Sequence, residues 1–159
     1  PAPEQATFWS EDDNLVITGD QVLPRISPNV GVHATEPEAD PLGDWMDSCR
    51  HLAQFACEDH LALPGHNAPF TGLPLRLHQL IENHEGALNR LRAHIAEAPR
   101  CATECFLPLF GREIDDAVYG LATAESVAHL NYLWRRGEAV AAEDAEGALR
   151  FRPTGSAAG

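Results

Sequence analysis

The sequence predicts an α/β fold in which a small sheet flanked by helices precedes a mostly helical domain that ends in a β-hairpin. Three observations indicate this fold. Two short apolar runs, 15–17 and 61–63, each stop at a turn that contains glycine, as buried strands do. A long run, 74–98, repeats apolar residues at helical spacing. Near the end of the chain, 138–142 and 148–152 flank a polar turn.

The first strands carry two polar turns of interest. Segments 7–10 and 14–18 are predicted to form a hairpin around an acidic turn at 11–13, and the second strand is apolar enough to be covered on both faces. The strand at 14–18 ends in Thr18-Gly19-Asp20, and the strand at 61–63 ends in Pro64-Gly65-His66. Carboxylate and imidazole are common metal ligands, although each pattern alone is also typical of an ordinary turn.

The middle of the chain predicts one long loop and two helices. Segment 23–43 holds four prolines and two glycines, so it is predicted to be irregular, and long loops of this kind are usually functional. Segment 44–58 is predicted to be a helix whose apolar face includes Trp45 and Phe55. The longest helix is predicted over 74–98 and ends before Pro99. Its stripe consists of Leu77, Leu80, Ile81, His84, Leu88, Leu91 and Ile95.

The last third predicts a winged-helix-like domain. A short helix at 103–110 is closed by Gly111, a longer helix at 115–136 stops at Gly137, and a hairpin follows. The longer helix carries Arg135 and Arg136 but also several acids. We therefore interpret this domain as an interaction or pocket-closing module and not as a reader of DNA.

Composition narrows the classes of function. The chain has 159 residues, 44% of them hydrophobic, which suits one domain or one and a half small ones. Its net charge is −13, with 24 acids against 11 bases, and every base is arginine. Such a charge repels polyphosphate, so a nucleic-acid partner is not expected. No apolar run approaches the roughly 18 residues needed to span a bilayer, and no signal segment opens the chain, so a cytoplasmic location is expected.

The four cysteines leave two alternatives open. None of Cys49, Cys57, Cys101 and Cys105 has the CxxC spacing of a zinc motif, but Cys101 and Cys105 would share a face if their segment is helical. The first alternative is a zinc site at that face. The second is a set of reduced, half-buried thiols.

These motifs resemble those of the metallo-β-lactamase-fold hydrolases, in particular the subgroup with a C-terminal winged-helix domain. In that family the Asp of the Gly-Asp motif bridges two metal ions and the His of the Pro-Gly-His motif binds one of them, which by motif are Asp20 and His66. The implied fold is half of an αββα sandwich followed by the winged-helix-like domain. The matching segments are Pro3-Glu4-Gln5, Thr18-Gly19-Asp20-Gln21-Val22-Leu23, Ile26-Ser27-Pro28, Asp40-Pro41-Leu42, Pro64-Gly65-His66 and Asn83-His84.

One part of the family pattern is missing from the sequence. None of the eight histidines forms an HxH pair, so the family's main metal motif, HxHxDH, is absent, and Pro1 stands where a further metal-binding His is usual. We therefore expect this chain to be the C-terminal half of such a protein. The expected parts are the end of the metallo-β-lactamase-like domain at 1–73, a connecting helix at 74–98, the winged-helix-like domain at 99–153 and a frayed tail at 154–159.

The resemblance also assigns roles to residues away from the two turns. The loop that holds His33 helps to form the substrate pocket in the family, so His33 is a candidate for substrate binding; the alternative is a solvated loop histidine. Trp45 is a second candidate, with core packing as the alternative. In the family a histidine at the position of His84 packs near the metal ligands, so His84 is a candidate for supporting them, with a satisfied core histidine as the alternative.

Two functions from different classes follow from these observations. The first is the C-terminal portion of a hydrolase in which two divalent ions, with zinc expected, activate water against an ester, thioester or lactone of a small molecule. No catalytic residue is assigned to this chain, which alone should bind metal weakly or not at all because it offers two ligands. The second is a non-catalytic partner-binding or dimerising module. In either case the expected partner is the missing N-terminal half or a second copy of the chain.

Overall fold

The computed structural model describes residues 5–155 and divides into two compact units. The first unit contains the residues up to Asn29 together with Gly43–Asn83, and the second contains Val30–Leu42 together with the residues from His84 onward. The mixed α/β character that the sequence predicts is confirmed. The Pro3-Glu4 part of the motif and residues 156–159 of the predicted tail lie outside the described residues.

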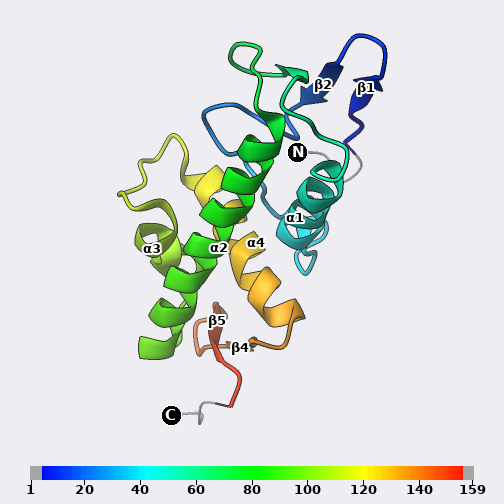
Figure 1. The fold of residues 1–159 in the computed structure, drawn as a ribbon. Coiled ribbons are helices and arrows are strands. Elements are labelled where there is room, and N and C mark those ends of the chain that lie inside the picture. The colour runs from blue at the N-terminus through cyan, green and yellow to red at the C-terminus, as the bar shows by residue number, and fades with distance from the viewer. Residues whose placement is uncertain (1–4, 156–159) are drawn as a thin grey trace. The chain divides into compact units, whose positions relative to one another are not determined.

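The first unit contains a three-stranded sheet, of which Figure 1 labels the first two strands. β1 (Phe8–Ser10) pairs antiparallel with β2 (Leu15–Gly19), and β2 pairs parallel with β3 (Leu61–Pro64). The predicted hairpin is thus confirmed. Its turn closes at Asn14, which has a positive φ of 51°, a conformation that asparagine tolerates better than most residues.

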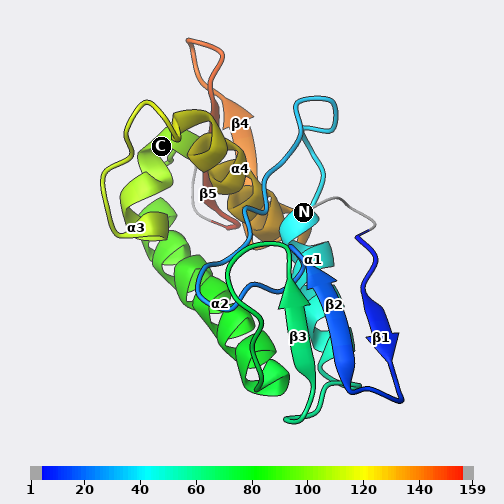
Figure 2. The same cartoon turned by 90° about the horizontal axis from the view of Figure 1, so that it is seen from above.

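The two faces of this sheet differ in burial. Val16 and Ala62 are opposite one another in the register and are fully buried. The face that carries Phe8 and Ile17 is exposed, by 65% and 50% respectively. Helix α1 (Pro41–Leu52) lies on one side of the sheet (Figure 2), so one apolar face of the second strand is left bare in the described residues.

Helix α1 begins three residues before the predicted start and ends six residues before the predicted end. Pro41 is tolerated in the first turn because its missing N–H has no helical partner there. The end is early because the chain tightens into short turns: the N–H of Phe55 donates to the carbonyl of Leu52 at 3.1 Å. Phe55 is consequently 59% exposed and does not join the apolar face that the sequence assigned to it.

Helix α2 (Leu73–Glu97) confirms the longest predicted helix within one residue at each end. Gly72 precedes it with a φ of +78°, and its carbonyl accepts the N–H of Arg76 at 3.1 Å, which begins the helix. The predicted stripe is buried apart from Ile81, which is partly exposed. The buried members are Leu77, Leu80, His84, Leu88, Leu91 and Ile95.

The second unit contains the remaining helices. A 3-10 turn, η1 (Ala102–Cys105), leads into α3 (Phe106–Phe110), and α4 (Tyr119–Arg135) follows. Gly111 and Gly137 both have a left-handed backbone, with φ of 66° and 70°, and end α3 and α4 as the sequence predicts. Helix α4 starts four residues later than predicted, because residues 115–118 form a turn instead.

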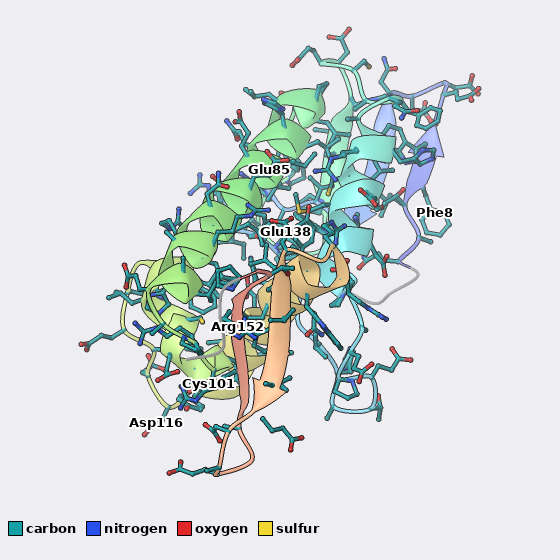
Figure 3. The ribbon with its side chains drawn as sticks, turned by 90° about the horizontal axis from the view of Figure 1, so that it is seen from below. Phe8, Glu85, Cys101, Asp116, Glu138 and Arg152 are labelled. Carbon is teal, nitrogen blue, oxygen red and sulfur yellow. The ribbon has the colours of Figure 1, made fainter. Side chains whose placement is uncertain are left out.

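The predicted C-terminal hairpin is confirmed as β4 (Ala139–Glu143) paired antiparallel with β5 (Leu149–Pro153). The Asp144 carboxylate holds the turn. It accepts hydrogen bonds from the backbone N–H groups of Glu146 and Ala148 and forms an ion pair with Arg150. Glu138, labelled in Figure 3 just before β4, accepts two hydrogen bonds from Arg92 of α2, at 2.6 and 3.1 Å.

Thr154 is more firmly held than a frayed tail would be. Its N–H donates to the carbonyl of Glu138 at 3.0 Å and its hydroxyl to the carbonyl of Gly137 at 2.6 Å. Among the described helices, none has the length and the apolar content that crossing a membrane requires.

Candidate functional site

The local fold places Asp20 and His66 at the same edge of the sheet. Strands β2 and β3 run parallel, so their carboxyl ends lie together, and each candidate residue follows one of these ends. Gly19 has a φ of +52°, which favours glycine, and this conformation turns the chain immediately before Asp20. The turn is fixed by the N–H of Gln21, which donates to the carbonyl of Thr18 at 3.1 Å.

The two candidate side chains are in direct contact. The Nδ1 atom of His66 lies 2.7 Å from Oδ1 of Asp20. A carboxylate only accepts, so Nδ1 carries the proton, and in a neutral ring Nε2 then keeps its lone pair. Both side chains are open to solvent, at 67% for His66 and 41% for Asp20. The arrangement therefore presents a carboxylate and an imidazole lone pair at one exposed position.

Gly65 is required for this contact. The N–H of Gly65 donates to the carbonyl of Gly19 at 2.9 Å, which ties the two turns together. A Cβ atom at position 65 would collide with Oδ1 of Asp20. Glycine is therefore needed before His66 for a steric reason, which the sequence pattern alone does not reveal.

The donor set matches part of a metal site. Carboxylate oxygen and imidazole nitrogen suit zinc, iron and manganese alike. Within residues 5–155, however, no group of three or more His, Cys, Asp or Glu side chains is gathered so that it could hold an ion. The pair Asp20 and His66 therefore offers two ligands, fewer than the three or four that a zinc site uses.

Arg76, which the sequence analysis did not single out, and Gln21, which belongs to the matched motif, support the segment after Asp20. Arg76 donates from Nε to the carbonyl of Leu23 at 2.6 Å and from a terminal nitrogen to that of Ile26 at 2.9 Å. Partial burial lowers the pKa of its guanidinium. The Gln21 side chain donates to the hydroxyl of Ser48 at 3.1 Å. In the sequence, Arg76 is recognisable only as a polar residue beside the apolar stripe of the long helix, and this position does not indicate its contacts with the loop.

The two candidates for substrate binding occupy different environments. Trp45 is only 4% exposed, and its indole N–H donates to the carbonyl of Gln21 at 3.1 Å, so its ring belongs to the core of the first unit. His33 is exposed in the loop of the second unit, where its carbonyl accepts the N–H of Glu36 at 2.9 Å.

His84 is half of a buried pair of imidazoles in the second unit. Its Nδ1 lies 3.1 Å from Nε2 of His129, whose own Nδ1 lies 2.8 Å from the carbonyl of Glu125. Since that carbonyl only accepts, Nδ1 of His129 is protonated and Nε2 accepts from His84. Burial lowers the pKa of His84 to about 3, and the neighbouring ring contributes. Burial lowers the pKa of His129 to about 4, and the charge of Arg90 contributes, although the hydrogen bond to the Glu125 carbonyl acts in the opposite direction.

The buried cysteines are held as thiols. Burial raises the pKa of Cys105 to about 12, and its thiol donates to the carbonyl of Cys101 at 3.3 Å. Burial likewise raises the pKa of Cys49 to about 12. All four cysteines are free. Because the thiolate is the metal-binding form, the raised pKa values describe Cys49 and Cys105 as neutral thiols in this structure.

Comparisons with known proteins agree with these motifs. Residues 88–154 match the family described as "Metallo-beta-lactamase-like, C-terminal domain". A beta-lactamase domain protein from Burkholderia ambifaria is 38% identical, with a TM-score of 0.89 over 93% of this chain and 44% of that one. A metallo-beta-lactamase family protein from Thermus thermophilus is 31% identical, with a TM-score of 0.77 over the same shares. This chain belongs to the metallo-β-lactamase superfamily.

Curated relatives in the superfamily are longer than this chain. The lactamase-like protein nscB of Arthroderma benhamiae is 31% identical over 144 residues, which are 82% of this chain and 30% of the relative. The protein of that name from Trichophyton verrucosum is also 31% identical over 144 residues, again 82% of this chain but 46% of the relative. The chain therefore spans less than half the length of these relatives, and its residues 88–154 match a C-terminal domain of a hydrolase-fold family.

Proposed function

We propose that this chain is the C-terminal portion of a metal-dependent hydrolase and supplies two ligands, Asp20 and His66, to its metal site. The observation that supports this proposal is their 2.7 Å contact at the shared edge of β2 and β3. The superfamily generally uses divalent metals, and we propose zinc, with two ions in the intact protein. When bound, such ions would activate water for attack on an ester, thioester or lactone carbonyl of a small molecule.

In this proposal the residues of the chain orient ligands and do not react themselves. Gly65 allows the two turns to approach, and Asp20 fixes the His66 ring by accepting the Nδ1 proton, so that Nε2 points its lone pair to a ligand. The remaining ligands would come from a segment equivalent to the part of the relatives that this chain does not span, and the resemblance to the family implies an HxHxDH motif there. The chain alone should then bind metal weakly.

Further roles are proposed for the residues around this site. His33 would contact substrate, with Trp45 shaping the pocket from the core, and His84 would support the ligands indirectly. The described sheet would be half of an αββα sandwich, and η1 to β5 would be a winged-helix-like domain that binds a partner or closes the pocket instead of binding nucleic acid. We also propose a cytoplasmic location.

The exposed sheet face supports a partner in this assembly. Register places the side chains of one face together, and they are apolar but not buried: Phe8, Leu15, Ile17, Leu61 and Leu63. Apolar surface of this kind is typical of an interface. We propose that the N-terminal half of the fold covers it, in preference to a second copy of the chain.

Metal content tests the proposal. In the native polypeptide that contains this sequence, elemental analysis should find divalent metal, and Asp20→Asn with His66→Ala should lower the metal stoichiometry. His78→Ala, which removes an exposed histidine of α2, should leave it unchanged. A metal content that is unaffected by the double substitution would contradict the proposal.

The exposed apolar sheet face also favours one alternative, a non-catalytic partner-binding module. In that case neither the native polypeptide nor its variants would retain metal. The chain would still form a stable complex through the exposed sheet face, and Ile17→Glu would weaken that complex in light scattering.

A further inference from the structure

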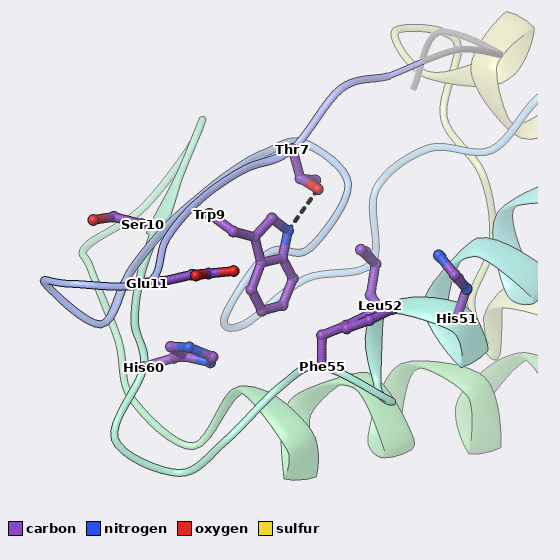
Figure 4. Close-up of a pocket in the computed structure, with 8 residues that line it drawn as sticks. All are labelled: Thr7, Trp9, Ser10, Glu11, His51, Leu52, Phe55 and His60. Atoms are coloured by element: carbon purple, nitrogen blue, oxygen red, sulfur yellow. Dashed lines mark hydrogen bonds between the residues drawn. The ribbon is translucent and has the colours of Figure 1, made fainter.

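A hollow of about 500 Å³ lies in the first unit between β1 and the end of α1 (Figure 4). We call it the Trp9 pocket. The indole of Trp9 projects into its middle, with the Glu11 and His60 side chains on one side and Leu52 and Phe55 on the other. It is separate in position from the Asp20–His66 pair, because Glu11 follows β1 near the beginning of β2, whereas Asp20 follows the end of β2.

The Trp9 pocket also remains open when the exposed sheet face is covered. Successive residues of a strand point to opposite faces. Trp9 is opposite Val16 in the register, on the face that α1 packs against, whereas Phe8 is opposite Ile17 on the exposed face. A partner that covers Phe8 and Ile17 would therefore leave the Trp9 pocket accessible.

The aromatic side chains of the pocket are held in position. The indole N–H of Trp9 donates to the hydroxyl of Thr7 at 2.9 Å, so its polar atom is satisfied, and the ring remains partly exposed. The His60 ring meets the Trp9 ring edge-on, with centroids 5.2 Å apart and planes at 82°. Its Nδ1 accepts the backbone N–H of Cys57 at 3.0 Å, which fixes the ring. Phe55 is 59% exposed and offers a second aromatic surface.

The charge of the pocket selects the class of ligand. Glu11 is the only Asp, Glu or Arg among its eight lining residues, and Asp12 and Asp13 follow it in the same turn. No arginine lines the pocket, and the whole chain has a net charge of −13. A carboxylate attracts a nearby cation, and so does an indole ring, because the face of the ring is electron-rich. Neither group would attract an anion.

We propose that the Trp9 pocket binds a small organic cation with an aromatic or alkyl body. Its ammonium group would lie against Glu11 and the Trp9 ring, and its apolar body would cover Leu52 and Phe55. This site is independent of the proposed metal site, since the two use different residues at opposite ends of the sheet.

Calorimetric titration of the chain with phenethylammonium tests the proposal. Saturable binding in the millimolar range or tighter is expected, and Glu11→Gln should weaken it about tenfold. Phe55→Ala removes an exposed ring and should weaken binding severalfold without loss of folding. Glu146→Gln, an exposed acid of the β4–β5 turn, is the matched control and should change nothing. The anion 3-phenylpropionate should bind at least about tenfold more weakly.

The proposal would be overturned by no saturable binding of phenethylammonium at millimolar concentration, by equal affinity of the Glu11→Gln and Glu146→Gln variants, or by equal affinity for the anion. The indole N–H resonance of Trp9 should shift on titration, and a shift only at Trp45 or Trp134 would place the ligand elsewhere and also reject it. The Asp20→Asn and His66→Ala variants should bind phenethylammonium as the unsubstituted chain does, whether or not they lose metal.

Discussion

Two of the side-chain pairs that include histidine, one in each unit, differ mainly in their access to water. Asp20 and His66 are 2.7 Å apart in the first unit, and His84 and His129 are 3.1 Å apart in the second. The first pair is exposed, whereas His84 and His129 are 5% and 2% exposed. Contacts of similar length therefore have different consequences: the exposed pair is available to a ligand, and the buried pair affects stability.

The largest effect that follows from this comparison is on acid stability. Both buried histidines have a folded-state pKa, about 3 for His84 and about 4 for His129, below the ordinary 6.5. As the pH falls below 6.5 the unfolded chain takes up protons that the folded chain does not. The free energy of unfolding should therefore fall between pH 6.5 and about 3, by several kcal/mol in order of magnitude.

Denaturant titrations at pH 7 and pH 4 measure this fall. Substitution of His129 by Gln keeps a polar side chain that does not titrate, so the fall between the two pH values should be smaller in that variant. His66→Gln removes an exposed histidine and serves as the control, with an unchanged fall. An equal fall in all three proteins would show that the buried pair does not set the acid stability.

A smaller effect is expected at the glycine that supports the exposed pair. Gly65→Ala places a methyl group against Asp20 and should lower the free energy of unfolding by about 1–3 kcal/mol. Gly86→Ala is the matched control, because Gly86 lies within α2 and its Cβ would meet only the end of the Arg90 side chain at 3.6 Å. That change should be neutral or stabilising by up to about 1 kcal/mol. Thermal melts of both variants measure the difference, and equal melting temperatures would contradict the steric argument.

The smallest effect on stability is expected for the exposed pair itself. Asp20→Asn should change the free energy of unfolding by less than about 1 kcal/mol, because a solvent-exposed ion pair contributes little. The same substitution should nevertheless lower metal content in the native polypeptide. A large loss of stability in denaturant titration, equal to that of a buried substitution, would mean that the contact is structural.

Local sequence determined much of this fold. The apolar runs that end at Gly19 and Gly65 became parallel strands, the 3–4 spacing of 74–98 became α2, and the glycines at 111 and 137 end helices. Each of these features depends on periodicity or on backbone conformation within a few residues, which is why composition and spacing could indicate them. The proximity of Asp20 and His66 follows from the parallel pairing of their strands.

Tertiary structure decided which of these residues are buried and what they touch. The pairing of His84 with His129 joins positions 45 residues apart, and no local pattern specifies it. The same holds for Phe55, which the helical spacing placed in the core but the early end of α1 leaves in solvent beside Trp9. Burial and long-range contact depend on how the elements pack, and packing is a property of the whole unit, whereas periodicity is a property of each segment.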